Sequence, residues 1–124
     1  MLYTEILNNN RDFLNLYRKG QSIVSKYAVI YFRRNGLDVN RFGITAGKKV
    51  GNAVRRNRAK RIIRQAYRDC EPLFPVGLDI VIVARAATPS ARSYDIAAFL
   101  KGRALKIINK AMNCNNEENI HSAD

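Results

Sequence analysis

The amino-acid sequence predicts an α+β fold: a single-domain α/β sandwich with the element order αβββαβα and one small sheet of three or four strands. Three observations predict it. Apolar residues recur at helical spacing in two long segments, 52–70 and 93–113. They alternate in two other segments, 22–34 and 41–47, as in strands with one buried face. The run LDIVIVA at 78–84 is rich in β-branched residues, which is typical of a buried strand.

The chain of 124 residues fits one domain, which we expect to span residues 10–113. No internal repeat or linker divides it. The segment 1–9 is mixed in character and the segment 114–124 is polar, so we expect both to be flexible.

The first predicted helix covers about residues 11–19. Asn9 or Asn10 can cap its start, because an asparagine side chain accepts hydrogen bonds from the free N–H groups of a first helical turn. Phe13 and Tyr17 are four residues apart, so they share one face of this helix.

Strand segments are expected next. The segment 22–34 predicts strand with an interruption near Lys26, after which the alternation is clean. One face should carry Tyr27, Val29, Tyr31 and Arg33, and the other Ala28, Ile30 and Phe32. The following strand, about 41–47, has one face of mostly small residues, which lets another backbone approach closely. That face consists of Arg41, Gly43, Thr45 and Gly47.

The main helix is predicted to begin at Gly51-Asn52, with Asn52 as its cap, and to end near Cys70, before Pro72. Its apolar stripe is narrow, so the helix should lie flat on the sheet and expose its other faces. The stripe consists of Ala59, Ile62, Ile63, Ala66 and Cys70. A last helix is expected from Ser93 to about Asn113.

Positive charge dominates the chain, which has 22 Lys and Arg residues against 10 Asp and Glu and a formal net charge of +12. No acidic residue lies between Asp38 and Asp69. A solvated helix normally mixes charges of both signs, so this segment indicates an anionic partner, with nucleic acid the leading candidate. Its basic residues are Arg41, Lys48, Lys49, Arg55, Arg56, Arg58, Lys60, Arg61, Arg64 and Arg68.

An anionic membrane surface is the weaker alternative. No apolar run approaches the roughly 18–20 residues of a spanning helix. The first residues lack the basic start and apolar stretch of a signal peptide. We therefore expect a cytoplasmic protein without a membrane partner. Cys70 and Cys114 match no metal-ligand spacing and are expected to be reduced thiols.

The basic residues are arranged around a helix start. Lys48 and Lys49 lie just before the main helix, whose N-terminal N–H groups already favour phosphate. Within the helix, four-residue spacing predicts two basic faces, and arginine forks match phosphate oxygens and stack on bases. One face carries Arg56, Lys60 and Arg64, and its neighbour carries Arg58, Arg61 and Arg68.

The aromatic residues allow two interpretations. Aromatic rings beside an arginine form a stacking platform for single-stranded bases, worth about 1–3 kcal/mol per base. Ordinary core packing is the alternative. We favour the platform for Tyr17, Tyr27 and Tyr31, near Arg33, and leave both interpretations open for Phe13.

Catalysis by the protein itself is not expected. Protein nucleases cluster carboxylates around metal ions or use histidine as an acid and base. The only histidine, His121, is in the tail, and the aspartates are scattered along the chain. The sequence predicts no catalytic residue and no metal ligand.

The segment GKKVGNAVRRNRAKRIIRQAYR at 47–68 resembles the signature of the bacterial ribonuclease P protein subunit. That signature combines paired lysines, Gly-Asn-Ala-Val, Arg-Asn-Arg, Lys-Arg and a further arginine. DFLNLYRKG is similar to the family's first helix and LDIVIVAR to its last strand, so the resemblance spans about 11–108. This chain departs from the family before the first helix, where Arg11 is the only basic residue.

The resemblance implies an α/β sandwich whose strand–helix–strand crossover, carrying the basic helix, is left-handed, against the general right-handed rule. It implies that the protein is a non-catalytic subunit assisting a catalytic RNA. That RNA removes the 5′ leader of precursor tRNA by metal-dependent hydrolysis and holds the Mg²⁺. The implied partners are the ribonuclease P RNA and precursor tRNA, with no protein partner.

The residue pattern and the resemblance together predict two sets of binding residues. Those expected to contact the catalytic RNA are Lys48, Lys49, Asn52, Arg56, Asn57, Arg58, Lys60, Arg61, Arg64 and Arg68. Those expected to line a cleft for the leader are Phe13, Tyr17, Tyr27, Tyr31 and Arg33.

Two other functions remain open at this stage. A structural RNA-binding protein, such as a ribosomal component, would account for the basic helix, although it needs no aromatic cleft for a single strand. An independent nuclease would cleave RNA without an RNA subunit.

Overall fold

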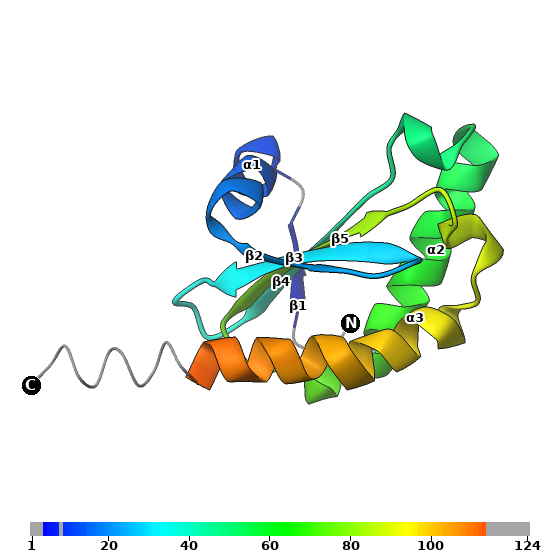
Figure 1. The fold of residues 1–124 in the computed structure, drawn as a ribbon. Coiled ribbons are helices and arrows are strands. Elements are labelled where there is room, and N and C mark those ends of the chain that lie inside the picture. Colours follow the sequence, from blue (N-terminus) through cyan, green and yellow to red (C-terminus); the bar gives the residue numbers. More distant parts are fainter. Residues whose placement is uncertain (1–3, 8, 114–124) are drawn as a thin grey trace, which may run out of the picture.

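The computed structural model describes residues 4–7 and 9–113, which form a five-stranded mixed sheet with helices on both faces (Figure 1). The strand order is β1-β4-β5-β3-β2. The strands are β1 (Thr4–Ile6), β2 (Gln21–Val24), β3 (Ala28–Arg34), β4 (Asn40–Thr45) and β5 (Leu78–Ala84). The helices are α1 (Asn10–Lys19), α2 (Ala53–Cys70) and α3 (Ser93–Phe99). A π-helical segment, Leu100–Ala104, continues α3 into a further α-helical stretch at 105–113.

The helices divide between the two faces of the sheet. Figure 1 shows α1 above the sheet and α3 below it. On the α1 side, Leu16 packs with Leu7 and Val81 in a small cluster. The larger core lies on the other side, under α2 and α3, and buries Ile30 and Ile63. The alternation predicted for β3 is confirmed from Ala28 onward.

The predicted order of elements is confirmed, with one addition at its start. The sequence placed Thr4–Ile6 in a flexible segment, but these residues form β1, which pairs in parallel with β4. The N–H of Leu7 extends the pairing by donating to the carbonyl of Phe42 at 2.7 Å. A three-residue strand shows too little alternation to be recognised from sequence. The expectations for 1–3, 8 and 114–124 lie outside the described residues.

The expected interruption near Lys26 is also present. β2 and β3 form an antiparallel pair with Ile23 opposite Ile30, and the turn between them covers Ser25–Tyr27. β4 and β5 are parallel neighbours, and α2 connects them across the larger core. The crossover is therefore the predicted one, and its left-handedness stays a prediction.

The C-terminal half of α2 is held by an aromatic stack. The ring of Tyr67 lies parallel to Phe42, with centroids 3.9 Å apart, and also stacks on Phe74 at 5.6 Å. Burial raises the pKa of Tyr67 to about 12. Its hydroxyl is 2.9 Å from the Thr4 hydroxyl, which also donates to the Glu71 carboxylate at 2.5 Å. These contacts fix β1 against α2.

Two properties of the described residues bear on function. No helix among them is long and apolar enough to cross a membrane. Within the same part of the chain, no three His, Cys, Asp or Glu side chains are grouped so that they could hold a metal ion.

Candidate nucleic-acid interface

The start of α2 is capped as the sequence predicts. The Asn52 side-chain oxygen accepts a hydrogen bond from the N–H of Arg55 at 3.0 Å. Lys48 and Lys49 are exposed in a 3₁₀ turn immediately before it. Gly51, between this turn and Asn52, has φ 133°, a backbone conformation that residues with a side chain rarely adopt. The helix start therefore presents free N–H groups and two ammonium groups together, which suits a phosphate.

α2 buries one face and exposes its cations. Ala59, Ile63 and Ala66 are buried as predicted, and Ile62 is only partly covered. Tyr67, which the sequence analysis did not assign to the stripe, is fully buried. Of the predicted RNA-binding residues on this helix, Asn57, Arg58, Arg61 and Arg68 are exposed, whereas Arg56, Lys60 and Arg64 are partly buried.

The two basic faces of α2 border different hollows. Lys60 and Arg64 face a groove that we call the α1–α2 groove, which runs from α1 over the edge of β4 to α2. Its other lining residues are Ile6, Leu7, Phe13, Phe42, Gly43 and Ile44. Arg58 and Arg61 border a shallower hollow with Gln65 and Ser93 at the start of α3. Arg56 belongs to neither lining, and its buried Nε has no hydrogen-bond partner among the described residues.

The small-residue face of β4 has the close approach that was predicted. A Cβ atom added at Gly43 would lie 2.5 Å from a ring carbon of Phe13 and 2.7 Å from the carbonyl oxygen of Leu7. Only glycine leaves room for α1 and the chain before it at this distance. Phe13 is half-buried and packs with the small cluster under α1, so it both supports the helix and borders the groove.

The predicted aromatic residues do not all come together. Tyr17 and Tyr31 form an edge-to-face pair with centroids 4.8 Å apart, and Phe13 packs in the same cluster as Tyr31. Tyr27 packs instead against the larger core, and Lys26 Nζ lies 5.3 Å from its ring centroid. The predicted shared face of Tyr27 and Tyr31 is wrong, because Tyr27 belongs to the turn and β3 begins one residue later.

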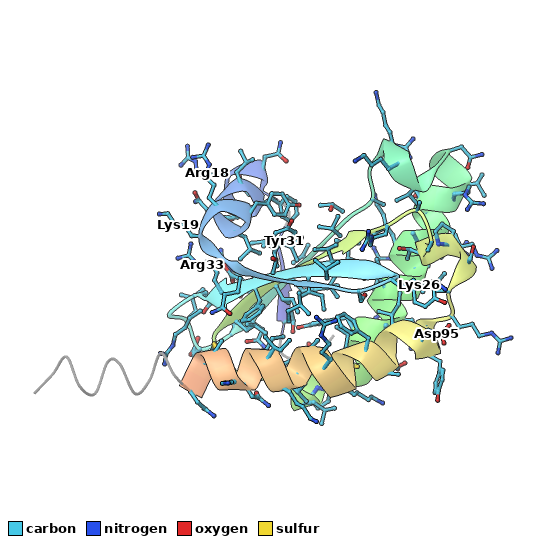
Figure 2. The ribbon with its side chains drawn as sticks, viewed as in Figure 1. Arg18, Lys19, Lys26, Tyr31, Arg33 and Asp95 are labelled. Atoms are coloured by element: carbon cyan, nitrogen blue, oxygen red, sulfur yellow. The ribbon has the colours of Figure 1, made fainter. Side chains whose placement is uncertain are left out.

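Arg33 is also separated from the aromatic residues. It borders one pocket together with Lys19, and Figure 2 shows it at the end of the sheet opposite to Lys26. It lines a polar pocket that contains none of the predicted aromatic residues and is bordered by Asp12, Asn15, Arg33, Asn35, Arg41 and Asp79. Sharing a strand face with Tyr31 therefore does not bring Arg33 into the same site.

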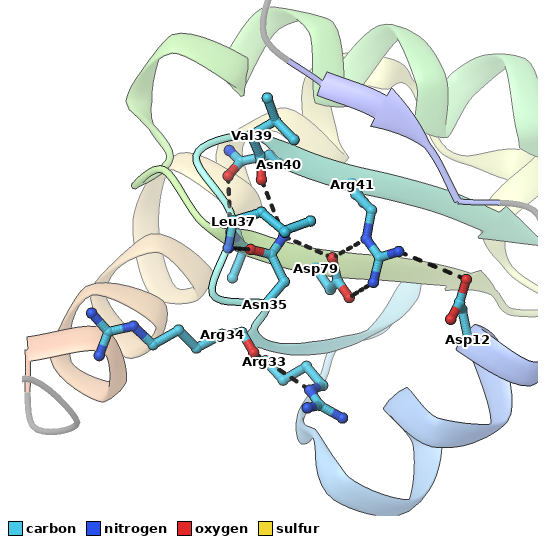
Figure 3. Close-up of polar contacts among 10 residues, drawn as sticks. Asp12, Arg33, Arg34, Asn35, Leu37, Val39, Asn40, Arg41 and Asp79 are labelled. Carbon is cyan, nitrogen blue, oxygen red and sulfur yellow. Dashed lines mark hydrogen bonds and ion pairs between the residues drawn. The ribbon is translucent and has the colours of Figure 1, made fainter. Parts of the chain in front are cut away.

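An ion pair organises this polar pocket (Figure 3). Arg41 donates from Nε and a terminal nitrogen to the two oxygens of Asp79, at 2.8 and 2.6 Å. The bond to Asp79 raises the pKa of Arg41. Asn35 Nδ2 also donates to Asp79 at 2.9 Å, and Asp12 lies 3.8 Å from Arg41. The sequence signal for this pair was one acidic residue, Asp79, within an otherwise apolar run.

The cations of α2 have no such partners in the part of the chain that the structure describes. Between described residues, both ion pairs involve Arg41, one with Asp12 and one with Asp79. The carboxylate nearest in sequence to the helix's basic faces, Asp69, accepts instead from Gln65 Nε2 at 3.0 Å. The positive charge of α2 is therefore available to an external anion.

Comparison with known proteins agrees with this geometry. The family model described as Ribonuclease P matches residues 1–109. The chain is 44% identical over 97 residues to the ribonuclease P protein component of Lachnoclostridium phytofermentans, covering 78% of this chain and 84% of that protein. It is 40% identical over 99 residues to the same component of Clostridioides difficile, covering 79% and 87%.

Solved structures show the same fold. The RNase P protein of Staphylococcus aureus superposes with a TM-score of 0.70 at 34% identity, covering 82% of this chain and 93% of that one. The RNase P protein of Thermotoga maritima gives a TM-score of 0.70 at 33% identity, covering 86% and 96%. With the family model matching most of its length, this chain belongs to the ribonuclease P protein component family.

Proposed function

We propose that this chain is the protein subunit of a ribonuclease P holoenzyme in the cytoplasm, where it binds the catalytic RNA and the 5′ leader of precursor tRNA. In this role it assists the metal-dependent removal of the leader, which gives the mature 5′ end of the tRNA. The observation that carries the proposal is the capped helix α2, whose cations have no carboxylate partner among the described residues.

The catalytic RNA is assigned to the start and the exposed faces of α2. Lys48, Lys49 and the free N–H groups after Asn52 form one phosphate site. Arg58 and Arg61 border the hollow next to α3 and can fork onto phosphate oxygens. The further residues assigned to this contact are Arg56, Asn57, Lys60, Arg64 and Arg68. Mg²⁺ and the hydrolytic chemistry are assigned to the RNA.

The leader is assigned to the α1–α2 groove and the aromatic pair beside it. Phe13, Tyr17 and Tyr31 offer ring faces and edges to unpaired bases, while Lys60 and Arg64 lie across the groove for the backbone. Tyr27 lies outside this aromatic group and Arg33 lines a different pocket, so neither is needed for the proposed leader path.

Reconstitution tests the proposal. The protein is added to the ribonuclease P RNA of the same organism at low Mg²⁺, and cleavage of precursor tRNA is measured. We expect cleavage with both components and none with the protein alone, which also excludes an independent nuclease. RNA alone at high Mg²⁺ serves as the competence control. If a competent RNA gains nothing from the protein at low Mg²⁺, the proposal is wrong.

Two variants divide the proposal into its parts. Arg58→Ala should weaken binding of the catalytic RNA. It should also lower the salt slope, the slope of log affinity against log salt concentration, by about one, whereas Lys106→Ala, on the exposed side of the last helix, should not.

Tyr17→Ala should weaken binding of precursor tRNA by about tenfold, because one stacking contact is lost, but should not weaken binding of mature tRNA. Tyr94→Ala removes another exposed tyrosine, 75% exposed, and is the control.

A further inference from the structure

A second basic site lies at the end of the sheet away from Lys26. We call it the basic corner: the pocket bordered by Lys19, Gln21, Arg33 and Arg34, with Phe32 and Met112 among its apolar lining. Three elements supply these side chains, since Lys19 ends α1, Gln21 starts β2, and Arg33 and Arg34 end β3.

The ion pair of Asp79 explains why Arg33 has no carboxylate partner among the described residues. Arg33 and Arg41 are the two cross-strand neighbours of Asp79 in the sheet, so both could pair with its carboxylate. Arg41 occupies both oxygens of Asp79, and Asn35 takes a further bond to one of them. The remaining acid in the neighbouring pocket, Asp12, is 3.8 Å from Arg41.

The hydrogen bonding of Arg33 leaves most of its donors unused. Its Nε makes one long bond of 3.5 Å to the carbonyl of Arg34, and no other bond of its side chain is resolved among the described residues. A guanidinium has five N–H donors in a planar fork. Arg33 can therefore offer a bidentate face to an anion without giving up a contact that supports the fold.

The lining of the basic corner selects an anion over other ligands. Lys19, Arg33 and Arg34 border the pocket, and no acidic side chain among the described residues does. Like charges held around one hollow repel each other, and an anion between them removes that cost. Gln21 contributes an amide donor. A phosphate oxygen accepts from ammonium, guanidinium and amide groups alike, so a phosphate group fits this combination of donors.

We propose that the basic corner binds a phosphodiester group of RNA, separately from α2 and the α1–α2 groove. The inference rests on the proposed function, because it assumes an RNA partner. Lys19, Arg33 and Arg34 provide the charge, and the apolar lining next to Phe32 and Met112 limits water on one side of the anion. Either the leader or the catalytic RNA can supply the phosphate, since the chemistry is the same.

The test uses the full chain with Arg33→Gln/Arg34→Gln, which removes two charges from the corner. Lys101→Gln/Lys106→Gln removes two charges from exposed positions of the last helix and is the matched control. One arm measures the affinity of the catalytic RNA alone over a range of salt concentrations. The other measures holoenzyme affinity for precursor tRNAs with leaders of about three and about ten nucleotides. Thermal melting verifies that each variant folds.

In one of the two arms, we expect the corner variant to bind its RNA about tenfold more weakly than the control. In the same arm, the slope of log affinity against log salt concentration should be lower by about two. A loss with the catalytic RNA alone identifies that RNA as the source, and a loss confined to the long leader identifies the leader. If both arms match the control while wild type binds both RNAs, the corner is not an RNA site and the proposed function stands. If wild type binds neither RNA, the proposed function fails with it.

Discussion

At the scale of single residues, Asp79 has the largest predicted effect on stability. It is 5% exposed, and its carboxylate holds Arg41 and Asn35 (Figure 3). Asp79→Ala would leave Arg41 with only Asp12 at 3.8 Å, so we expect the free energy of unfolding to fall by about 2–4 kcal/mol. Asp12→Ala, in the same cluster but more exposed, should cost less than about 1 kcal/mol. Urea denaturation measures both, and equal losses would contradict this assignment.

Cys70 provides a pH-dependent contribution to stability. Its thiol is fully buried and donates to the carbonyl of Ala97 at 3.6 Å. Burial raises the pKa of Cys70 from an ordinary 9.0 to about 11. Between these values the unfolded thiol releases its proton and the folded one keeps it. The contribution is therefore complete below pH 9.0 and is lost as the pH rises towards about 11.

The Cys70→Ala variant tests this contribution. We expect a baseline stability lower by about 1 kcal/mol from the lost sulfur, but a shallower decline of the unfolding free energy between pH 9.0 and about 11. Urea denaturation at a series of pH values gives both quantities. Tyr67→Phe should flatten a later part of the decline, because the pKa of Tyr67 is raised to about 12. A wild-type slope in Cys70→Ala would show that the thiol does not titrate in this way.

At the scale of elements, the contact between β4 and α1 depends on Gly43. Gly43→Ala would place a methyl group 2.5 Å from Phe13 and 2.7 Å from the Leu7 carbonyl. We expect a loss of about 1–3 kcal/mol, because α1 and the chain before it must move away from the sheet. Gly47→Ala, with no atom within 4 Å of the added carbon, is the matched control and should stay within about 0.5 kcal/mol.

A second variant separates the two contacts at Gly43. Adding Phe13→Leu to Gly43→Ala relieves the clash with the ring but not the one with the Leu7 backbone. Thermal melting should therefore show partial rescue. Full rescue would mean that the backbone contact costs nothing, and a neutral Gly43→Ala would contradict the close packing of α1 altogether.

The elements also show which kinds of signal the sequence carries. α2 was predicted from its cap at Asn52 to its end at Cys70, because capping and apolar spacing are local properties. The burial of Tyr67 could also have been predicted, since Tyr67 lies four residues after the buried Ile63 and three before Cys70, on the same face of the helix. β1 had none, because a three-residue strand is defined by the free edge of β4 that it meets.

The site was harder to predict than the fold. The sequence identified the basic faces of α2, and the structure adds that they border two separate hollows. Strand alternation placed Tyr27 and Arg33 with Tyr31, and the family resemblance also assigned Tyr27 to the leader cleft. Alternation fixes the face of a residue within one strand, but it describes neither a turn residue such as Tyr27 nor the helix packed above the strand.

At the scale of the whole molecule, the cations form separate groups. α2 and the turn before it carry one group, and the basic corner carries another at the end of the sheet away from Lys26. The ion pairs between described residues neutralise only Arg41. The chain has a formal net charge of +12, so these groups of cations repel each other across the fold.

Salt should consequently act in opposite directions on folding and on RNA binding. Raising NaCl from about 50 mM to about 200 mM screens repulsion between cations, so we expect the unfolding free energy of the free protein to rise. Over the same range RNA affinity should fall steeply, because counterions released on binding gain less entropy when they enter a more concentrated salt solution. Arg58→Ala/Arg61→Ala should reduce both dependences together, giving a chain that is more stable at low salt and binds RNA with a smaller slope. Urea denaturation and equilibrium binding in the same buffers measure the two slopes. A protein that loses stability with added NaCl would show that attractions outweigh repulsions, and the basic faces would then have a structural role.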